Sequence, residues 1–226
     1  MRFWFAAAVL AVMPACAAQN EPFAAQVLRV AGMAPGSGAA TDPDDEIDTG
    51  ELWLVDLKLN TRRPIASQGF RSPVFAPSGD AVYAIRDDVI VRISLSGGAP
   101  EDVFQLDSIT KLAGFAPDGR LLLTADDNNM VGFLTLADKK IRWLTPDESR
   151  AEDKAALERV RGWERVYGDT RVATERQTST SKRWTDVMLH EGANDPVNVS
   201  QGDGVFCGQP AYAPAARMVV YVRAPQ

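Results

Sequence analysis

The sequence predicts an all-β fold of about four repeats, each with four short strands, and one helical insertion in the third repeat. Three observations predict this class. A turn motif recurs along the chain, runs rich in β-branched and aromatic residues follow its copies, and Gly, Pro, Asp and Asn separate these runs.

The turn motif reads Phe-Ala-Pro-Ser-Gly at residues 75–79 and Phe-Ala-Pro-Asp-Gly at residues 115–119, a spacing of 40 residues. A weaker copy, Tyr-Ala-Pro-Ala-Ala, begins 97 residues after the second copy, at residues 212–216. One full unit with an insertion of 17 residues therefore lies between the last two copies. Because Pro presets one turn residue and Gly accepts a positive φ, each copy predicts a turn between the first and second strand of a repeat.

Three further classes of strand align across the repeats. The predicted second strands are residues 81–86, 121–126, 171–177 and 218–223. The predicted third strands are residues 51–57, 89–95, 130–136 and 185–191. The predicted fourth strands are residues 62–66, 102–106, 141–145 and 196–200. Four short antiparallel strands in a unit of about 40 residues are typical of a β-propeller blade.

The turn motif, the strand that follows it and the third strand Glu-Leu-Trp-Leu-Val-Asp-Leu at residues 51–57 resemble the PD40, or TolB-type WD40-like, propeller repeat. The resemblance covers residues 50–145 and the last 20 residues. Residues 170–174 and 184–187 are similar to blades of prolyl-oligopeptidase-type hydrolases. The resemblance implies a scaffold whose members dock proteins, bind ligands or gate a hydrolase, and it leaves the function open.

Together, the predicted blades form a single propeller domain over residues 19–226. Residues 68–107, 108–145 and 146–207 form three blades in this scheme. The fourth joins residues 208–226 with residues 26–67, so that the two ends of the chain clasp and close the ring. Residues 26–31 also look like a second strand and could take the position of residues 218–223 in the fourth blade. In that case the ring is open, and a second copy, as in a homodimer, or another chain completes it.

Residues 1–18 read as a secretory signal peptide. Arg2 supplies the positive charge, residues 3–13 are apolar, and residues 14–18 offer small side chains for cleavage. This predicts export to the periplasm or beyond. A lipid anchor on Cys16 is an alternative, and it is the only membrane attachment that we expect. Cys207 is interpreted as a small buried hydrophobic residue.

The insertion in the third blade is predicted to be helical. Residues 145–148, Thr-Pro-Asp-Glu, have the pattern of a capping box with Pro at the first helical position. Ala156, Val160, Trp163 and Tyr167 then form an apolar stripe. The stripe either packs on its own blade or docks a partner.

Acidic residues cluster in the connections between second and third strands. Chain direction places these connections at one end of the propeller and the Phe-Ala-Pro turns at the other. An acidic rim beside the insertion would attract a basic protein surface or a cation, although Asp and Asn also occur in turns for local reasons. The candidate partner-binding residues are Asp42, Asp44, Asp45, Asp87, Asp88, Asp126, Asp127, Val160, Trp163 and Tyr167.

Composition narrows the classes of function. A net charge of −6 disfavours a nucleic-acid binder, and one His with two separated Cys leaves little material for zinc, haem or iron–sulfur sites. Residues 42–47 lack the Gly of a calcium loop, so we expect no metal and no cofactor. The sequence has no Gly-x-Ser-x-Gly elbow, and His190 lies in a predicted strand, so no catalytic residue is predicted.

These observations favour an exported, non-enzymatic propeller that acts as a protein–protein interaction scaffold in a bacterial envelope. One alternative is an accessory propeller that gates or positions a peptidase or other hydrolase on a separate chain. Another is a periplasmic propeller that binds a small ligand.

Overall fold

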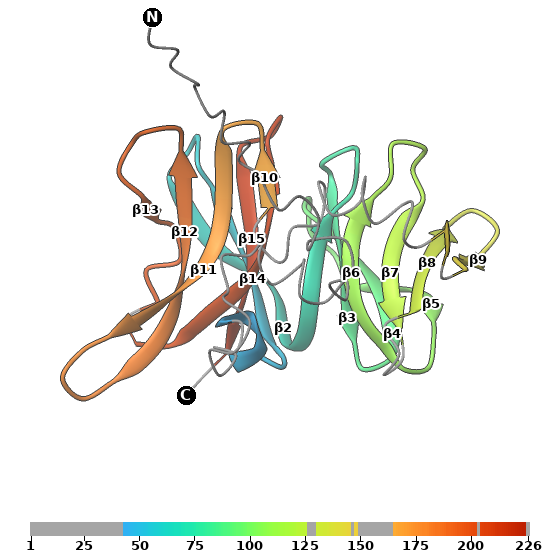
Figure 1. The fold of residues 1–226 in the computed structure, drawn as a ribbon, viewed down its shortest axis with the longest axis horizontal. Coiled ribbons are helices and arrows are strands. Elements are labelled where there is room, and N and C mark those ends of the chain that lie inside the picture. The colour runs from blue at the N-terminus through green and yellow to red at the C-terminus, as the bar shows by residue number, and fades with distance from the viewer. Residues whose placement is uncertain (1–42, 126–129, 146, 149–164, 203, 225–226) are drawn as a thin grey trace, which may run out of the picture. The chain divides into compact units, whose positions relative to one another are not determined.

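The computed structural model describes residues 43–125, 130–145, 147–148, 165–202 and 204–224. All described residues belong to one compact unit, which spans Thr41–Gln226. Its described residues form β-strands and one short 3₁₀ helix, η1 (Pro43–Glu46), before the first strand, and Asp147 and Glu148 are the only other helical residues among them (Figure 1). No helix of the described residues has the length and apolar character needed to cross a bilayer.

The strands form four blades of a β-propeller, as the sequence predicts (Figure 1). Blade 1 consists of the second part of β2 (Thr61–Phe75), β3 (Ala81–Arg86), β4 (Val89–Ser94) and β5 (Glu101–Gln105). Blade 2 consists of β6 (Ile109–Phe115), β7 (Leu121–Ala125), β8 (Met130–Thr135) and β9 (Lys140–Trp143). Blade 3 consists of β10 (Arg165–Tyr167), β11 (Thr170–Thr178), β12 (Arg183–Glu191) and β13 (Val197–Asn198). Blade 4 consists of β14 (Phe206–Ala213), β15 (Met218–Ala224), β1 (Gly50–Asp56) and the first part of β2.

Blade 4 joins the two ends of the described chain. Strand β1 pairs antiparallel with β15, in a register that runs from Glu51 opposite Arg223 to Asp56 opposite Met218. The other edge of β1 pairs with β2. The β1–β15 pairing confirms that the two ends of the described chain meet in blade 4, where β15 takes the position that the sequence also allowed for residues 26–31. Those residues lie outside the described part of the chain. Closure of the whole ring stays a prediction, since the described strands form three separate sheets.

Strand β2 is longer than predicted, because it serves two blades. Its first part pairs with β1, and its second part, from Phe70, pairs with β3. The sequence predicts a strand ending at Ala66 and a new blade at residue 68. Instead the chain stays extended, and a register shift with a positive φ of 97° at Gly69 turns it from one blade into the next. Blades 4 and 1 therefore share one seven-stranded sheet.

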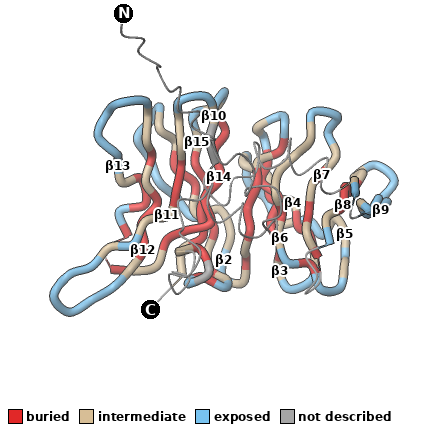
Figure 2. Tube along the Cα trace, viewed as in Figure 1, coloured by how far each residue is buried: buried red, intermediate tan, exposed pale blue. Residues whose placement is uncertain are grey.

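Apolar side chains pack between neighbouring blades, and the buried segments run along the strands (Figure 2). One core joins blades 1 and 2 around Val74 and Leu123, and another joins blades 3 and 4 around Val187 and Tyr221. Blades 4 and 1 pack through two smaller cores. Among the described residues, no core cluster joins blade 2 with blade 3.

Cys207 belongs to the core between blades 3 and 4 and is fully buried. Burial raises the pKa of its thiol to about 12. The prediction of a buried hydrophobic cysteine is confirmed.

The capping box of the predicted insertion forms. The Thr145 hydroxyl accepts a hydrogen bond from the backbone N–H of Glu148, and the Glu148 carboxylate accepts one from the N–H of Thr145, at 3.2 and 3.0 Å. The backbone bond from Thr145 lowers the pKa of Glu148. The body of the predicted helix, residues 149–164, lies outside the described residues.

A chain of hydrogen bonds crosses all four blades. In blade 3, Thr174 donates its hydroxyl to the Asp44 carboxylate of η1, which also accepts the backbone N–H of Gln209 in blade 4 at 2.6 Å. The Gln209 carboxamide accepts the N–H of Ser72 in blade 1 at 2.7 Å. The Ser72 hydroxyl then bonds the N–H and C=O of Leu112 in blade 2, at 2.8 and 3.2 Å. Because most of these groups are buried, they depend on one another for hydrogen bonding.

Candidate functional site

A pocket opens where the first strand of each blade ends. Its volume is about 620 Å³, and its wall is built from the Phe-Ala-Pro and Tyr-Ala-Pro turns of blades 1, 2 and 4, with the end of β10 from blade 3. Each blade contributes one aromatic side chain from its first strand. These side chains are Phe75, Phe115, Tyr167 and Tyr212. We call this cavity the turn-end pocket.

The turns hold their shape through short-range bonds that the repeated sequence supplies. The N–H of Gly79 donates to the carbonyl of Ala76, and Gly119 donates likewise to Ala116, both at 2.9 Å. The two glycines have φ values of 73° and 84°, a region that is strained for other residues. In blade 4, Arg217 takes this conformation, with a φ of 54°.

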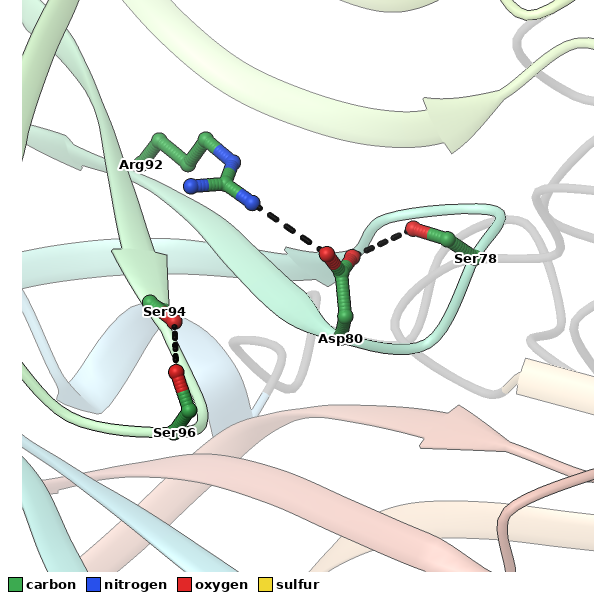
Figure 3. Close-up of polar contacts among 5 residues, drawn as sticks. All are labelled: Ser78, Asp80, Arg92, Ser94 and Ser96. Carbon is green, nitrogen blue, oxygen red and sulfur yellow. Dashed lines mark hydrogen bonds and ion pairs between the residues drawn. The ribbon is translucent and has the colours of Figure 1, made fainter.

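A polar cluster braces the turn of blade 1 (Figure 3). The Ser78 hydroxyl donates to the Asp80 carboxylate, and the Arg92 guanidinium reaches the other Asp80 oxygen at 3.3 Å. The hydrogen bond from Ser78 lowers the pKa of Asp80. In the turn of blade 2, Asp118 stands at the position of Ser78 and bonds Arg120 at 2.7 Å, and this bond lowers the pKa of Asp118. Neither carboxylate is part of the pocket wall.

The pocket wall itself is uncharged at neutral pH. Tyr167 and Tyr212 meet edge to face, with ring centroids 5.3 Å apart, and Phe115 meets Tyr83 of blade 1 in the same manner and at the same distance. Burial raises the pKa of Tyr212, so its hydroxyl stays protonated. The remaining wall residues are Val, Phe, Ala, Pro, Ser and Gly. Such a wall can pack apolar groups and can hydrogen-bond through hydroxyl and backbone groups.

The predicted acidic rim is only partly in the described chain. Asp87 and Asp88 form the exposed turn between β3 and β4, and the φ of Asp87 is 53°. Arg71 lies beside them and donates to the backbone carbonyls of Asp87 and Ile109, at 3.1 and 2.7 Å. Asp42, Asp126, Asp127, Val160 and Trp163, with the side chain of Asp45, lie outside the described residues.

The sequence predicts that Asp44 and Tyr167 bind a partner at the end of the blades that carries the acidic loops, but both lie elsewhere. Asp44 is 2% exposed and holds η1 against blades 3 and 4, because its carboxylate accepts the bonds from Thr174 and Gln209. It therefore does not belong to an exposed rim. Tyr167 ends the first strand of blade 3 and faces Tyr212 in the turn-end pocket, at the opposite end of the blades from Asp87.

Sequence reasoning assigned the Phe-Ala-Pro motif to turn formation and so missed Phe75, Phe115 and Tyr212 as site residues. The available signal was the aromatic residue that precedes each Ala-Pro pair. Since the repeat places it at the same point of each first strand, the aromatic residues must converge wherever blades share an axis.

His190 lies on the sheet face of blade 3, with Nε2 2.7 Å from the Glu175 carboxylate and 3.2 Å from the Arg171 guanidinium. Among the described residues, no group of three His, Cys, Asp or Glu side chains could hold a metal ion.

Comparison with known proteins gave matches only among solved structures. No family model and no characterised protein matched the sequence. A putative TolB from Agrobacterium tumefaciens is 15% identical with a TM-score of 0.38, over 75% of this chain and 59% of that one. The β-propeller domain of the trilobed protease from Pyrococcus furiosus, which has an open velcro topology, is 11% identical with a TM-score of 0.29, over 76% and 68%.

The acylaminoacyl peptidase of Pyrococcus horikoshii is 13% identical with a TM-score of 0.33, over 64% of this chain and 26% of that enzyme. The chain thus spans less than two thirds of the TolB protein and about a quarter of the peptidase.

Proposed function

We propose that this protein is an exported, non-enzymatic β-propeller scaffold that binds an uncharged segment of a protein partner in the turn-end pocket. The observation that carries the proposal is the convergence of one aromatic residue from each of four blades on a single uncharged cavity of about 620 Å³. A rigid sheet scaffold that presents turns around an apolar pocket is suited to holding an apolar anchor. The signal-like N-terminus supports a periplasmic or secreted location.

The pocket differs from the acidic rim in the forces that it offers a partner. Asp87 and Asp88 would attract a basic surface over a distance and would lose that attraction in salt. An uncharged wall of Phe, Tyr, Pro and Ala instead contributes apolar contact, which salt hardly weakens. The salt dependence of partner binding, and the effect of a charge inserted in the pocket wall, therefore show which of the two surfaces binds the partner.

The test is selection of peptides from a random displayed library, followed by titration of the selected peptides by fluorescence polarisation. Ala215 is an exposed wall residue, so Ala215→Arg places a charge in the pocket without touching the core. We expect this variant to weaken binding by about tenfold or more. Ala193→Arg, at an exposed turn outside the pocket wall, is the matched control and should bind as the unmodified protein does.

The Asp87→Asn/Asp88→Asn variant should bind the same peptides with unchanged affinity. Peptides that bind Ala215→Arg normally but lose affinity in this double variant and in salt would show that the acidic loops are the contact surface. Failure to select any peptide would also contradict the proposal.

A further inference from the structure

A second pocket lies at blade 3, with a volume of about 590 Å³. It is formed by the turn between β11 and β12, by β12 itself, by Asn198 of β13, and by Gln201, Gly202 and Gly204. In contrast to the turn-end pocket, most of its lining is polar. The side chains that matter for the argument are Lys182, Trp184, Asp186, Asn198 and Gln201.

An aromatic wall is fixed in this pocket by buried polar groups. Trp184 is half-buried, and its indole N–H donates to the Asp186 carboxylate at 2.9 Å. Asp186 is 4% exposed and also accepts the Ser200 hydroxyl and the Gly202 N–H, at 2.8 and 2.9 Å. The indole orientation is therefore set before any ligand arrives, which lowers the entropic cost of binding.

Three polar side chains of the lining can donate hydrogen bonds to a ligand, namely Lys182, Asn198 and Gln201. The carboxamide oxygen of Asn198 accepts the N–H of Gln201 at 2.8 Å, and that of Gln201 accepts the Arg62 guanidinium at 2.5 Å. Both oxygens already accept a hydrogen bond, whereas the amide N–H groups of these two side chains have no hydrogen-bond partner among the described residues and can donate to a ligand. Lys182 is exposed and adds an ammonium donor.

We propose that this blade 3 pocket binds an uncharged saccharide that carries an acetamido group. The C–H face of a sugar ring packs on Trp184, and its oxygens accept hydrogen bonds from Asn198, Gln201 and Lys182. The acetamido carbonyl is a stronger acceptor than a hydroxyl, so it fits a wall rich in donors. The pocket volume lies within the usual range for small-molecule sites, about 300–1,000 Å³.

Isothermal titration calorimetry and ligand-observed NMR with chitobiose and cellobiose test this inference, because the two disaccharides share their linkage and differ in the acetamido groups. Chitobiose should bind about tenfold more tightly than cellobiose. Trp184→Ala should weaken chitobiose binding by about tenfold, and Gln201→Ala by about threefold. Gln201 and Lys182 are exposed, so Gln201→Ala and Lys182→Ala keep the test valid if Trp184→Ala fails to fold.

Trp143→Ala, which removes an indole that is 36% exposed on blade 2, is the control and should bind chitobiose normally. Ala215→Arg should do the same, because the turn-end pocket is a different site. Equal affinity for the two disaccharides, no saturable chitobiose binding, or binding that survives both Gln201→Ala and Lys182→Ala would overturn the proposal.

Discussion

Replacing Asp44 should destabilise the fold strongly, because this carboxylate links η1 to two blades. The residue is 2% exposed and accepts hydrogen bonds from the Gln209 N–H and the Thr174 hydroxyl. A hydrogen bond to a charged group contributes about 1.5–3 kcal/mol, so loss of the two gives about 3–6 kcal/mol for Asp44→Ala. The buried N–H of Gln209 loses its acceptor and cannot reach water.

Urea denaturation followed by circular dichroism measures the effect. With a urea m-value of about 2 kcal/mol/M, a loss of 3 kcal/mol lowers the midpoint by about 1.5 M. The matched control is Glu46→Ala in the same 3₁₀ helix, where an exposed ion pair with Arg176 is worth less than about 1 kcal/mol.

Asp44→Asn keeps an acceptor oxygen and removes the charge, so it should fall between the two variants and gives a second measurement if Asp44→Ala does not fold. If Asp44→Ala and Glu46→Ala had the same midpoint, Asp44 would not be the buried link described above. It would then behave as the exposed rim residue that the sequence predicts.

Three further substitutions or treatments test the packing. Thr185→Val should raise the free energy of unfolding by about 1 kcal/mol, because this fully buried hydroxyl has no hydrogen-bond partner among the described residues; an unchanged midpoint in urea would contradict this. Cys207, whose pKa is raised to about 12, should resist iodoacetamide at pH 8 in the folded protein and react once urea unfolds the chain; rapid alkylation of the folded form, followed by mass spectrometry, would show that the site is open. Gly132→Ala places a Cβ 2.7 Å from the Trp143 ring and should destabilise by about 1 kcal/mol, and Trp143→Ala should remove that penalty in a double-mutant cycle.

The sequence predicted the strands because they depend on local pattern, and it predicted the β1–β15 pair because the repeat leaves half a unit at each end of the chain. Runs such as residues 81–86 and 218–223 carry their β-propensity in their own side chains, and turn residues mark their ends. What it did not predict depends on contacts between blades. Asp44 looks like any acidic loop residue until Thr174 and Gln209, far along the chain, are brought to it.

The pocket and the buried hydrogen-bond chain occur together because the first strands of blades 1, 2 and 4 each contribute one residue to each of them, at a fixed spacing. In blades 1, 2 and 4, the residue that takes part in a hydrogen bond to a neighbouring blade lies three positions before the pocket aromatic. The pairs are Ser72 and Phe75, Leu112 and Phe115, and Gln209 and Tyr212. In a regular strand, residues three apart point to opposite faces, but a register shift lies within or beside each of these intervals.

Ser72 and Gln209 take positive φ values of 54° and 51°, so the shifts in blades 1 and 4 are held by buried hydrogen bonds that outweigh backbone strain. Leu112 contributes only its backbone groups, which explains why no sequence motif marks the crossing position. The shifted strand ends then deliver the aromatic rings to one cavity. A substitution at Ser72 should therefore disturb both the pocket and the fold, whereas one at exposed Ala215 should disturb the pocket alone.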